Sequence, residues 1–425
     1  MRSEVAGLQR QLDSLSAALV AEPQQEPHLQ PVLFQQAYAP GEGATFTFAD
    51  GQSRLRLAAG LETLAVFSTK RTFPRGVPLL VLPDSPFGLK TNTFSAHARQ
   101  SYLNATFSGP EVAGFQTGGN VLTFFQNDNL TADDYGLLVY FAYGELKNED
   151  WRFSAGLQQD VFNPVSPTVL YLTKLYSSGN AGSYRGQLRL ERCLDVADDL
   201  DVVAQFALSD PRSFLVASDL GRLTEDNGWP NVEGRVEFGF GGKTEVRGAA
   251  VAPLRVGLSG VVGQLRTSRT GFAPPAALPP RSVIDVWGMG VDVQAGFGDR
   301  FGFAGEFFYG QGLGDYNAGV LQSFNSMTFD SVRTVGGFSE VYFYCSPTFH
   351  VHLGYGIDNP DDADLAQTQI RRNQTYYVTA IWDWSRSFQI GFEVDYRRTD
   401  YTQFQPNTFL NADAVVFGTR VLWRF

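Results

Sequence analysis

The chain ends in the stretch V-V-F-G-T-R-V-L-W-R-F, residues 415–425, and this stretch decides the fold. In an extended strand, successive side chains point to opposite faces. One face here carries Val415, Phe417, Thr419, Val421, Trp423 and Phe425, whereas Gly418, Arg420 and Arg424 lie on the other. A soluble sheet usually caps its last strand with polar residues. A strand with lipid on one side and water on the other needs this alternation. The terminus therefore predicts a strand of a transmembrane β-barrel.

The composition agrees with a barrel and excludes two other classes of protein. Aromatic residues reach 14%, whereas charged residues make up only 18% against a usual quarter. The longest apolar runs, such as residues 77–82, are much shorter than the roughly 18 residues that a membrane-spanning helix requires. The net charge of -11 argues against a nucleic-acid partner. The two cysteines, Cys193 and Cys345, suggest neither a disulfide framework nor a metal knuckle, and we do not expect them to pair.

Beyond Arg54 the hydrophobic period is two, and the connections between apolar runs alternate between short and long. We predict sixteen strands, at residues 54–67, 95–107, 113–127, 136–147, 151–159, 184–192, 200–208, 231–240, 253–265, 284–297, 300–310, 335–345, 348–357, 374–384, 387–398 and 412–425. An even number of strands, with short turns on one rim and long loops on the other, is the layout of bacterial outer-membrane barrels. The first strand must pair with the last, because unpaired backbone groups are costly in hydrocarbon. A barrel of this size encloses water.

The polar faces of these strands carry full charges of both signs. The predicted pore-wall charges are Arg54, Arg56, Arg152, Arg185, Arg189, Arg235, Glu237, Glu393, Asp395, Arg397 and Arg420. A cluster of arginines on neighbouring walls would attract carboxylates or phosphates. The alternative, which we favour for most of them, is that each arginine forms an ion pair with an adjacent Glu or Asp, so that ion pairs cover the wall.

The N-terminal residues predict a helix in front of the barrel. An a/d seam of two heptads is formed by Val5, Leu8, Leu12, Leu15 and Leu19. Two heptads are too short to associate alone, so a coiled coil here requires a larger oligomer; a single amphipathic helix is the alternative. The predicted domains are a periplasmic coiled-coil helix (1–22), a flexible linker rich in Pro, Gln and Gly (23–53) and the barrel (54–425). No signal peptide opens the chain, so we expect it to begin at the mature end or its gene start to be misplaced.

In its order of motifs, the chain resembles the DcaP-like outer-membrane porins. The resemblance rests on residues 160–162 (DVF), 179–185 (GNAGSYR) with Gln187 and Arg189, 305–307 (GEF), 342–344 (YFY), 354–358 (GYGID) and the aromatic terminus. It spans residues 54–425 loosely, and the leading heptads agree with it. It implies a homotrimer of sixteen-stranded barrels with a preference for small anionic solutes such as dicarboxylates. Segment 136–147 departs from this expectation, because Leu138, Tyr140 and Ala142 are predicted to face inward where basic residues are expected.

The long connection at residues 160–183 is the candidate constriction loop, because the loop after the fifth strand folds into the lumen in general porins. It holds only two charges, Asp160 and Lys174, with Tyr171 and Tyr176 between and beside them. A constriction needs few charges fixed on opposite walls, so that a transverse field orients the solute. An external loop at the trimer interface is the alternative.

Catalytic and metal chemistry find little support in the sequence. His350 and His352 share one strand face, as two metal ligands would. They have no third Cys or His nearby, so we expect a wet lumen wall. No Ser-His-Asp arrangement and no Gly-rich phosphate loop is recognisable. We therefore predict no catalytic residue, no metal and no cofactor.

The predicted function is that of a passive diffusion channel for small hydrophilic solutes in the outer membrane of a Gram-negative-type bacterium. Its expected partners are outer-membrane lipid and lipopolysaccharide, two further copies of the chain, and the barrel insertion machinery. The resemblance implies that Trp423 and Phe425 form the assembly signal for that machinery. An outer-membrane adhesin or lipid-modifying enzyme on the same barrel, or a soluble secreted multi-sheet protein, are the alternatives.

Overall fold

The computed structural model describes most of the chain from residue 43 onward. The described residues are 43–84, 91–127, 134–211, 224–225, 228–241, 244–246, 249–268, 281–298, 300–367, 369–402 and 410–425. The predicted coiled-coil residues Val5, Leu8, Leu12, Leu15 and Leu19 lie outside them, as does the linker up to residue 42.

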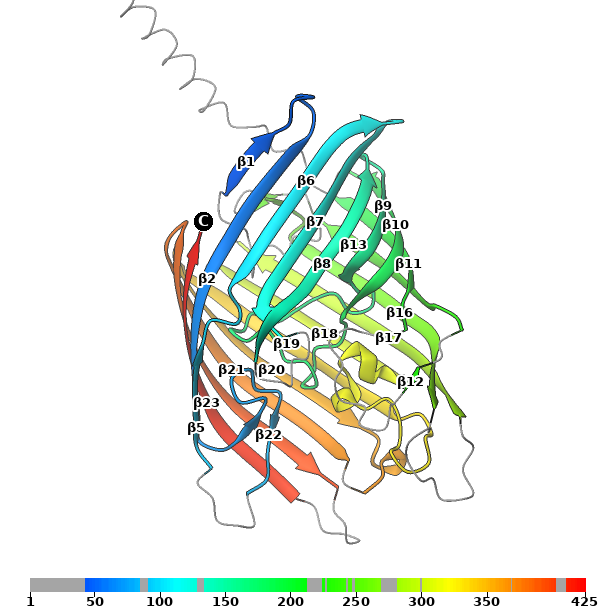
Figure 1. Ribbon diagram of the computed structural model, residues 1–425, viewed down its shortest axis with the longest axis vertical. Helices are drawn as coiled ribbons and strands as arrows, with labels where there is room; N and C mark the ends of the chain where they lie inside the picture. Colours follow the sequence, from blue (N-terminus) through cyan, green and yellow to red (C-terminus); the bar gives the residue numbers. More distant parts are fainter. Residues whose placement is uncertain are drawn as a thin grey trace, which may run out of the picture.

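Sixteen antiparallel strand positions form one closed barrel (Figure 1). In chain order the strands are β2 (Arg54–Ser68), β5 (Thr93–His97) with β6 (Tyr102–Val112), β7 (Phe115–Gln126), β8 (Tyr135–Lys147), β9 (Trp151–Gln159), β10 (Tyr184–Ala197), β11 (Leu200–Ser209), β13 (Asn231–Phe240), β16 (Leu254–Ser268), β17 (Arg281–Phe297), β18 (Phe301–Gln311), β19 (Arg333–Ser346), β20 (Phe349–Pro360), β21 (Ile370–Ser385), β22 (Phe388–Tyr401) and β23 (Leu410–Arg424). β5 and β6 share one position because both pair with the same edge of β2. The predicted sixteen-stranded antiparallel barrel is confirmed.

The last strand closes the barrel against the first. β23 pairs with β2 in a register that sets Trp423 opposite Leu61 and Phe417 opposite Phe67. Closure removes the exposed edge, whose unpaired backbone groups would be costly in lipid. Among the described residues, no helix is long and apolar enough to cross a membrane.

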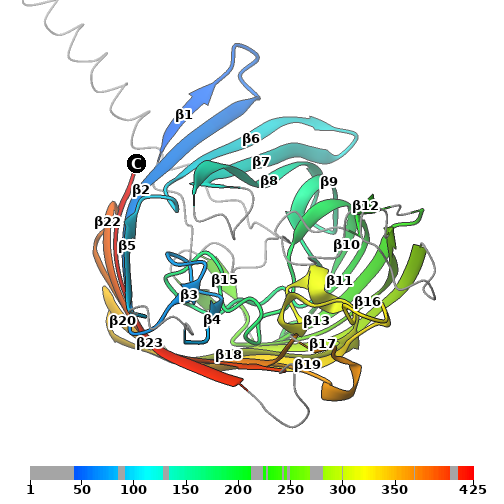
Figure 2. The same ribbon diagram turned by 60° about the horizontal axis from the view of Figure 1, so that its bottom comes forward.

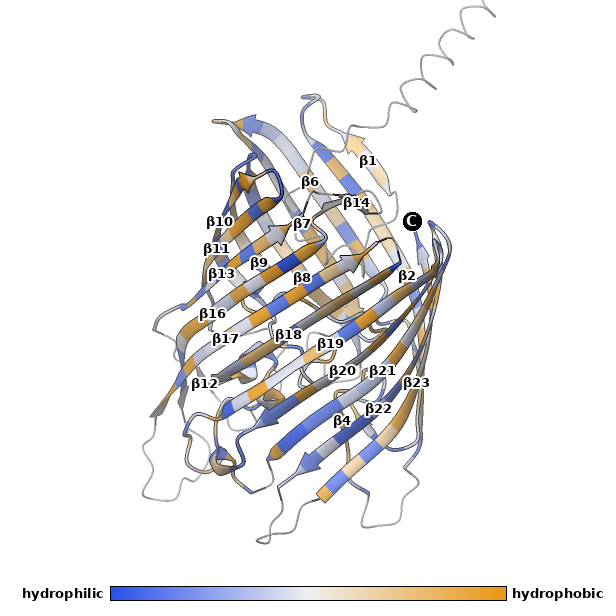
Figure 3. Ribbon diagram, turned by 180° about the vertical axis from the view of Figure 1, so that it is seen from behind, coloured by the Kyte–Doolittle hydropathy of each residue, from blue (hydrophilic) through white to orange (hydrophobic). Residues whose placement is uncertain are grey.

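On many strands apolar side chains face outward and charged ones face the lumen, as the period of two predicts. Leu188 and Phe392 are 63% and 52% exposed on the outer face, whereas their neighbours Arg189 and Glu393 are 9% and 1% exposed on the inner face. Alternating apolar and polar residues run along the strands in Figure 3. This arrangement excludes a soluble sheet sandwich, in which the apolar faces would pack against each other.

Part of the predicted linker is a strand. β1 (Ala44–Thr47) pairs with residues Arg54 to Leu57 of β2. β1 lies along the same edge of β2 as β23. Phe425, the residue after β23, makes two backbone hydrogen bonds with Ala59, at 2.9 and 3.2 Å. β1 therefore pairs the edge of β2 that β23 does not reach.

A bulge in β8 changes which residues of this strand face inward. Leu122 of β7 is opposite Phe141, but Thr123 is opposite Val139, so Tyr140 is an extra residue in the ladder. Leu138 and Tyr140 face inward as predicted, and both are fully buried. The prediction for Ala142 is wrong, because the bulge shifts the alternation and turns Tyr143, Glu145 and Lys147 inward instead.

Three connections on the long-loop side pack into the barrel. They are residues 69–84, with strands β3 (Thr72–Phe73) and β4 (Leu80–Val81), residues 160–183, and residues 312–332, with the 3-10 helices η2 (Leu313–Tyr316) and η3 (Gly319–Leu321). Figure 2 shows β3 and β4 inside the ring of strands. The remaining elements are small: β12 (Thr224–Glu225) beside β16, the hairpin of β14 (Thr244–Val246) and β15 (Ala249–Val251), and η4 (Asp362–Asp364).

Candidate functional site

The loop at residues 160–183 crosses the lumen and is held by carboxylates of the wall. Four glutamates on the inner faces of β13, β18, β19 and β22 accept hydrogen bonds from its backbone. Val161 N–H donates to Glu233 (2.8 Å), Thr168 N–H to Glu340 (2.7 Å), Leu170 N–H to Glu393 (2.6 Å) and Ala181 N–H to Glu306 (2.8 Å). We call Glu233, Glu306, Glu340 and Glu393 the tethering carboxylates. A hydrogen bond within a protein contributes about 1 kcal/mol net, and these four are spread along the loop, so together they fix its path.

The first residue of the loop is anchored by a buried ion pair. Arg185 donates from Nε to Oδ1 of Asp160 (2.7 Å) and from Nη2 to Oδ2 (3.0 Å), and both side chains are inaccessible to solvent. The Arg185 guanidinium also lies 3.9 Å from the centre of the Tyr316 ring in the loop at 312–332. Arg185 faces inward as predicted, and its contacts join the wall to two of the inward loops.

Lys174 lies against aromatic side chains. Its Nζ is 3.3 Å from the Tyr184 hydroxyl and 5.6 Å from the centre of the Tyr140 ring. Burial lowers the pKa of Lys174 to about 7, because the charged form is desolvated. Tyr171 and Tyr176 are buried as well. The four residues predicted for the constriction are thus packed between the loop and the wall.

A connected network of ionic side chains covers one side of the lumen, from β8 to β17. Arg152 binds Glu145 (2.7 Å) and Glu191 (3.1 Å), and Glu191 also binds Arg189 (2.6 Å). We call the following set the charged wall: Glu145, Lys147, Arg152, Arg189, Glu191, Arg235, Glu237, Arg255 and Asp292. Five of its members are cationic and four are anionic.

The second half of the charged wall is centred on Arg235. Its guanidinium binds Asp292 through two hydrogen bonds (2.7 and 3.0 Å) and Glu237 through one (2.6 Å). Glu237 also pairs with Arg255. Gln205 joins the two halves, because it accepts from Arg235 (3.2 Å) and donates to Glu191 (2.9 Å). The interpretation that the arginines pair with neighbouring acids is confirmed for these residues.

The other predicted pore-wall charges are spread around the lumen. Arg397 binds Asp395 (2.7 and 2.9 Å) and donates to the Pro78 carbonyl (2.9 Å), so the inward hairpin covers this pair. Arg420 donates to Gln389 at 2.6 Å. Arg54 and Arg56 are exposed near the N-terminal end of β2. The nine predicted charges other than Arg54 and Arg56 are therefore buried, but their environments differ.

His350 and His352 form a hydrogen-bonded pair on β20. The Nδ1 of His350 is 2.7 Å from the Nε2 of His352, and the Nδ1 of His352 is 2.8 Å from Glu340. Glu340 is also a tethering carboxylate, so the pair contacts the support of the loop. Within the described parts of the chain, no group of three or more His, Cys, Asp or Glu side chains is placed to hold a metal ion. Cys193 and Cys345 do not form a disulfide with each other.

Sequence reasoning missed the tethering function of the carboxylates, although the inward glycines carried a signal for the path of the loop. A Cβ on Gly391 would lie 2.6 Å from the Leu170 side chain, and one on Gly418 would lie 2.8 Å from the Tyr171 hydroxyl. Gly356 faces the Ser178 carbonyl at still closer range. Glycine on the polar face of a strand thus marks where the loop touches the wall.

Known structures share this architecture. The outer-membrane channel DcaP of Acinetobacter baumannii superposes with a TM-score of 0.66 at 14% identity, over 90% of this chain and 100% of the other. This chain has the porin fold. The porin fold is also shared with an anion-selective porin from Comamonas acidovorans (TM-score 0.53, 11% identity, 88% of this chain and 100% of the other). OmpT of Vibrio cholerae superposes with a TM-score of 0.51 at 12% identity, over 89% of this chain and 100% of the other.

The sequence comparisons found no match. No protein-family model matches the chain, and no curated protein matches it. At identities of 11–14% the structural likeness establishes the architecture, and the function must be argued from the lumen itself.

Proposed function

We propose that the chain is a passive, non-catalytic diffusion channel of the outer membrane for small hydrophilic solutes. The observation that carries this proposal is the charged wall inside a barrel whose outer face is apolar. Nine ionic side chains on one inner surface make that surface polar, which suits a barrel that encloses water and not one filled by an apolar core. The outer face, with residues such as Leu188 and Phe392 exposed, requires lipid.

The inward loop at 160–183 is proposed to narrow the passage. Its path across the lumen, from β13 to β22, places backbone and side chains where a wide barrel would otherwise be open. In this proposal the passage lies between the charged wall and the loop. A solute must shed part of its hydration there, and fixed charges offset that cost.

We propose a modest preference for anions. The charged wall has one more cation than anion, and Arg54 and Arg56 add two exposed guanidiniums to the inner surface near one end. Because most cations of the wall are already paired with carboxylates, the resulting field is weak. The anion selectivity in the name of the Comamonas porin agrees with this direction.

The assembly of the channel is also a proposal. We propose a homotrimer whose N-terminal helices, built on the heptads of residues 5–19, associate in the periplasm. The outer face would contact lipid and lipopolysaccharide. Trp423 and Phe425, both outward and exposed at the end of β23, would be read by the barrel insertion machinery.

The reversal potential of the channel in a planar bilayer tests the proposed function. In a tenfold potassium chloride gradient, we expect a potential whose sign reports chloride as the more permeant ion. A potential of opposite sign would overturn the proposed anion preference but not the proposed channel function. A protein that inserts as a folded barrel and passes no current would overturn the channel itself.

A further inference from the structure

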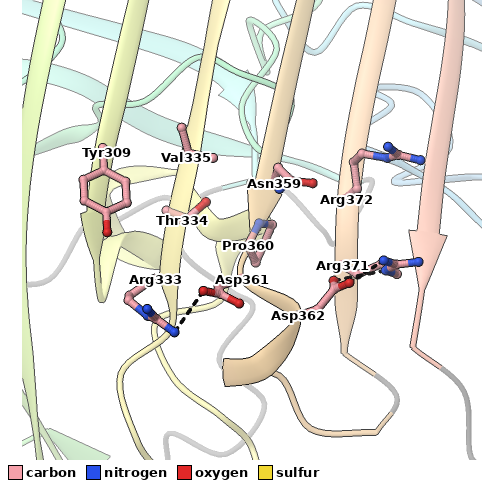
Figure 4. Close-up of a pocket in the computed structure, with 10 residues that line it drawn as sticks. All are labelled: Tyr309, Arg333, Thr334, Val335, Asn359, Pro360, Asp361, Asp362, Arg371 and Arg372. Carbon is pink, nitrogen blue, oxygen red and sulfur yellow. Dashed lines mark hydrogen bonds and ion pairs between the residues drawn. The ribbon is translucent and has the colours of Figure 1, made fainter. Parts of the chain in front are cut away.

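Strands β19 to β21 carry a polar cluster at each end, and the two clusters differ in chemistry. At the long-loop end, Arg333, Arg371 and Arg372 line a pocket (Figure 4), and aspartates bind all three guanidiniums. Arginine stays protonated at physiological pH, so these cations are fixed. At the short-turn end, His350 and His352 of β20 form a hydrogen-bonded pair, which we call the imidazole pair. Histidine changes its charge between pH 5 and 8, so this cluster can respond to acid.

The imidazole pair is the middle of a continuous chain of contacts between the wall and the loop. Nε2 of His350 lies 3.5 Å from Oδ2 of Asp383 on β21, and Nδ1 of His350 lies 2.7 Å from Nε2 of His352. Nδ1 of His352 lies 2.8 Å from Oε1 of Glu340 on β19. The other oxygen of Glu340 accepts from Thr168 N–H (2.7 Å). The contacts therefore run from Asp383 to the backbone of the loop at 160–183.

The geometry of the imidazole pair allows three protons on its four ring nitrogens. A carboxylate accepts hydrogen bonds, so we assign a hydrogen to each of the nitrogens that face Asp383 and Glu340. Only one hydrogen fits between Nδ1 of His350 and Nε2 of His352, because one of these two nitrogens must accept. One ring is then neutral and the other is cationic. A fourth proton would set two N–H groups against each other at 2.7 Å, so the contact between the rings would have to open.

The surroundings of the imidazole pair give it access to protons. Side chains of β19, β21 and β23 that contact the pair or its two carboxylates include Tyr342, Tyr344, Tyr377 and Arg424. Tyrosine stays neutral and arginine stays charged between pH 5 and 8, so the two imidazoles and the two carboxylates are the groups here that can take up protons. The side chain of Asp383 is 24% exposed, so water reaches this end of the chain of contacts.

We propose that the imidazole pair is an acid-sensitive switch that releases the loop at 160–183 from the wall. His350 is held from two sides, by Asp383 and by the Tyr344 ring, whose centre lies 4.9 Å from that of His350. A second positive charge on the pair therefore displaces His352. His352 orients the carboxylate of Glu340, so its displacement takes the acceptor away from the backbone of the loop.

The proton balance sets the direction of the switch. The released state binds one proton more than the docked state, so a lower pH favours release. One linked proton changes the ratio of released to docked loop by at most about tenfold per pH unit. The consequence for current rests on the proposed channel function, whereas the release of the loop does not.

Hydrogen exchange followed by mass spectrometry tests the release without requiring a current. The full chain is purified in detergent and exchanged at pH 7.5 and pH 5.0, with rates corrected for the intrinsic effect of pH. The variant His350→Gln removes the opposed N–H groups, because a glutamine amide can turn either its oxygen or its nitrogen toward His352. His97→Gln is the matched control. His97 is also buried and also contacts an inward loop, but its partner at 2.9 Å is the carbonyl oxygen of Gly76 and not a carboxylate.

We expect exchange around Thr168 to rise at least about fivefold from pH 7.5 to pH 5.0 in the unmodified chain and in His97→Gln, within the limit of one linked proton. In His350→Gln it should stay nearly constant. No rise in the unmodified chain, or an equal rise in His350→Gln, would overturn the proposal. If His350→Gln fails to fold on a heat-shift gel, His352→Gln takes its place, because it too leaves a single imidazole.

Single-channel recording at the same two pH values tests the link to the current. We expect acid to increase flicker in the unmodified chain and in His97→Gln, but not in His350→Gln. A chain that shows the rise in exchange and passes no current at either pH would support the switch and count against the channel.

Discussion

Removing a tethering carboxylate should loosen the loop at 160–183 and change the current through the barrel. Glu393 accepts from Leu170 N–H (2.6 Å) and from the Thr379 hydroxyl (2.8 Å) through the same oxygen. Glu393→Ala leaves the buried Leu170 N–H without its acceptor, which costs about 1–3 kcal/mol. Glu340→Ala removes the corresponding support of Thr168 N–H (2.7 Å) at a similar cost.

The two losses together decide how firmly the loop stays docked. A combined cost of roughly 2–6 kcal/mol lowers the docked-to-undocked ratio by a factor of about 30 or more, since 1.4 kcal/mol is tenfold. We therefore expect single channels of Glu340→Ala/Glu393→Ala to show larger conductance or rapid flicker. Glu393→Gln is the matched control, because it keeps an acceptor oxygen at the same position, and its traces should resemble those of the unmodified chain.

The assay is single-channel recording in planar bilayers, with folding checked by the heat-dependent shift of the barrel on a gel. A double variant that folds normally and conducts without added noise, at the conductance of the unmodified chain, would refute the reasoning. It would mean either that the loop is held by its apolar contacts alone or that it does not limit the passage.

Four further changes have defined outcomes. Gly391→Leu should displace the loop near Leu170 and lower the thermal midpoint of the barrel, whereas an unchanged midpoint would contradict the close approach. Burial lowers the pKa of Lys174 from 10.5 to about 7, so between these values the folded state binds fewer protons than the unfolded state. The unfolding free energy should therefore rise from pH 7 to pH 10. Lys174→Met should remove this pH dependence, and a variant that keeps it in urea titrations would contradict the prediction. Glu237→Gln removes one anion beside Arg235 and Arg255, so the reversal potential should shift toward chloride, and a shift toward potassium would contradict it. Deletion of Phe425 should lower the yield of folded barrel in cells, and an unchanged yield would exclude its function as an assembly signal.

The barrel could be predicted from the sequence because its determinant is local. Successive side chains of each strand face lipid and lumen in turn. Neighbouring pairs such as Leu188 and Arg189, or Phe392 and Glu393, therefore already reveal the two faces. Closure then follows from the cost of an open edge in hydrocarbon. The same alternation agrees with the burial of Arg189 and Arg235 on the side opposite the exposed apolar residues.

The interior could not be predicted to the same depth, because it depends on contacts between segments far apart in the chain. The acids that hold the loop, such as Glu340 at 172 positions from Thr168, have no local signature. The bulge at Tyr140 depends on pairing with β7, and it reversed the inward side of the strand beyond it. Asp160 and Lys174 were predicted to be the charges of a constriction loop, but the folded loop packs each against its own buried partners.

The current carried by the purified chain in a planar lipid bilayer tests the central claim most directly. If the barrel encloses water beside the charged wall, addition of protein should produce discrete, ohmic current steps, grouped in threes if the chain assembles as the proposed trimer. Folded barrels that are shown to reside in the bilayer, yet leave it insulating at every voltage, would contradict the account.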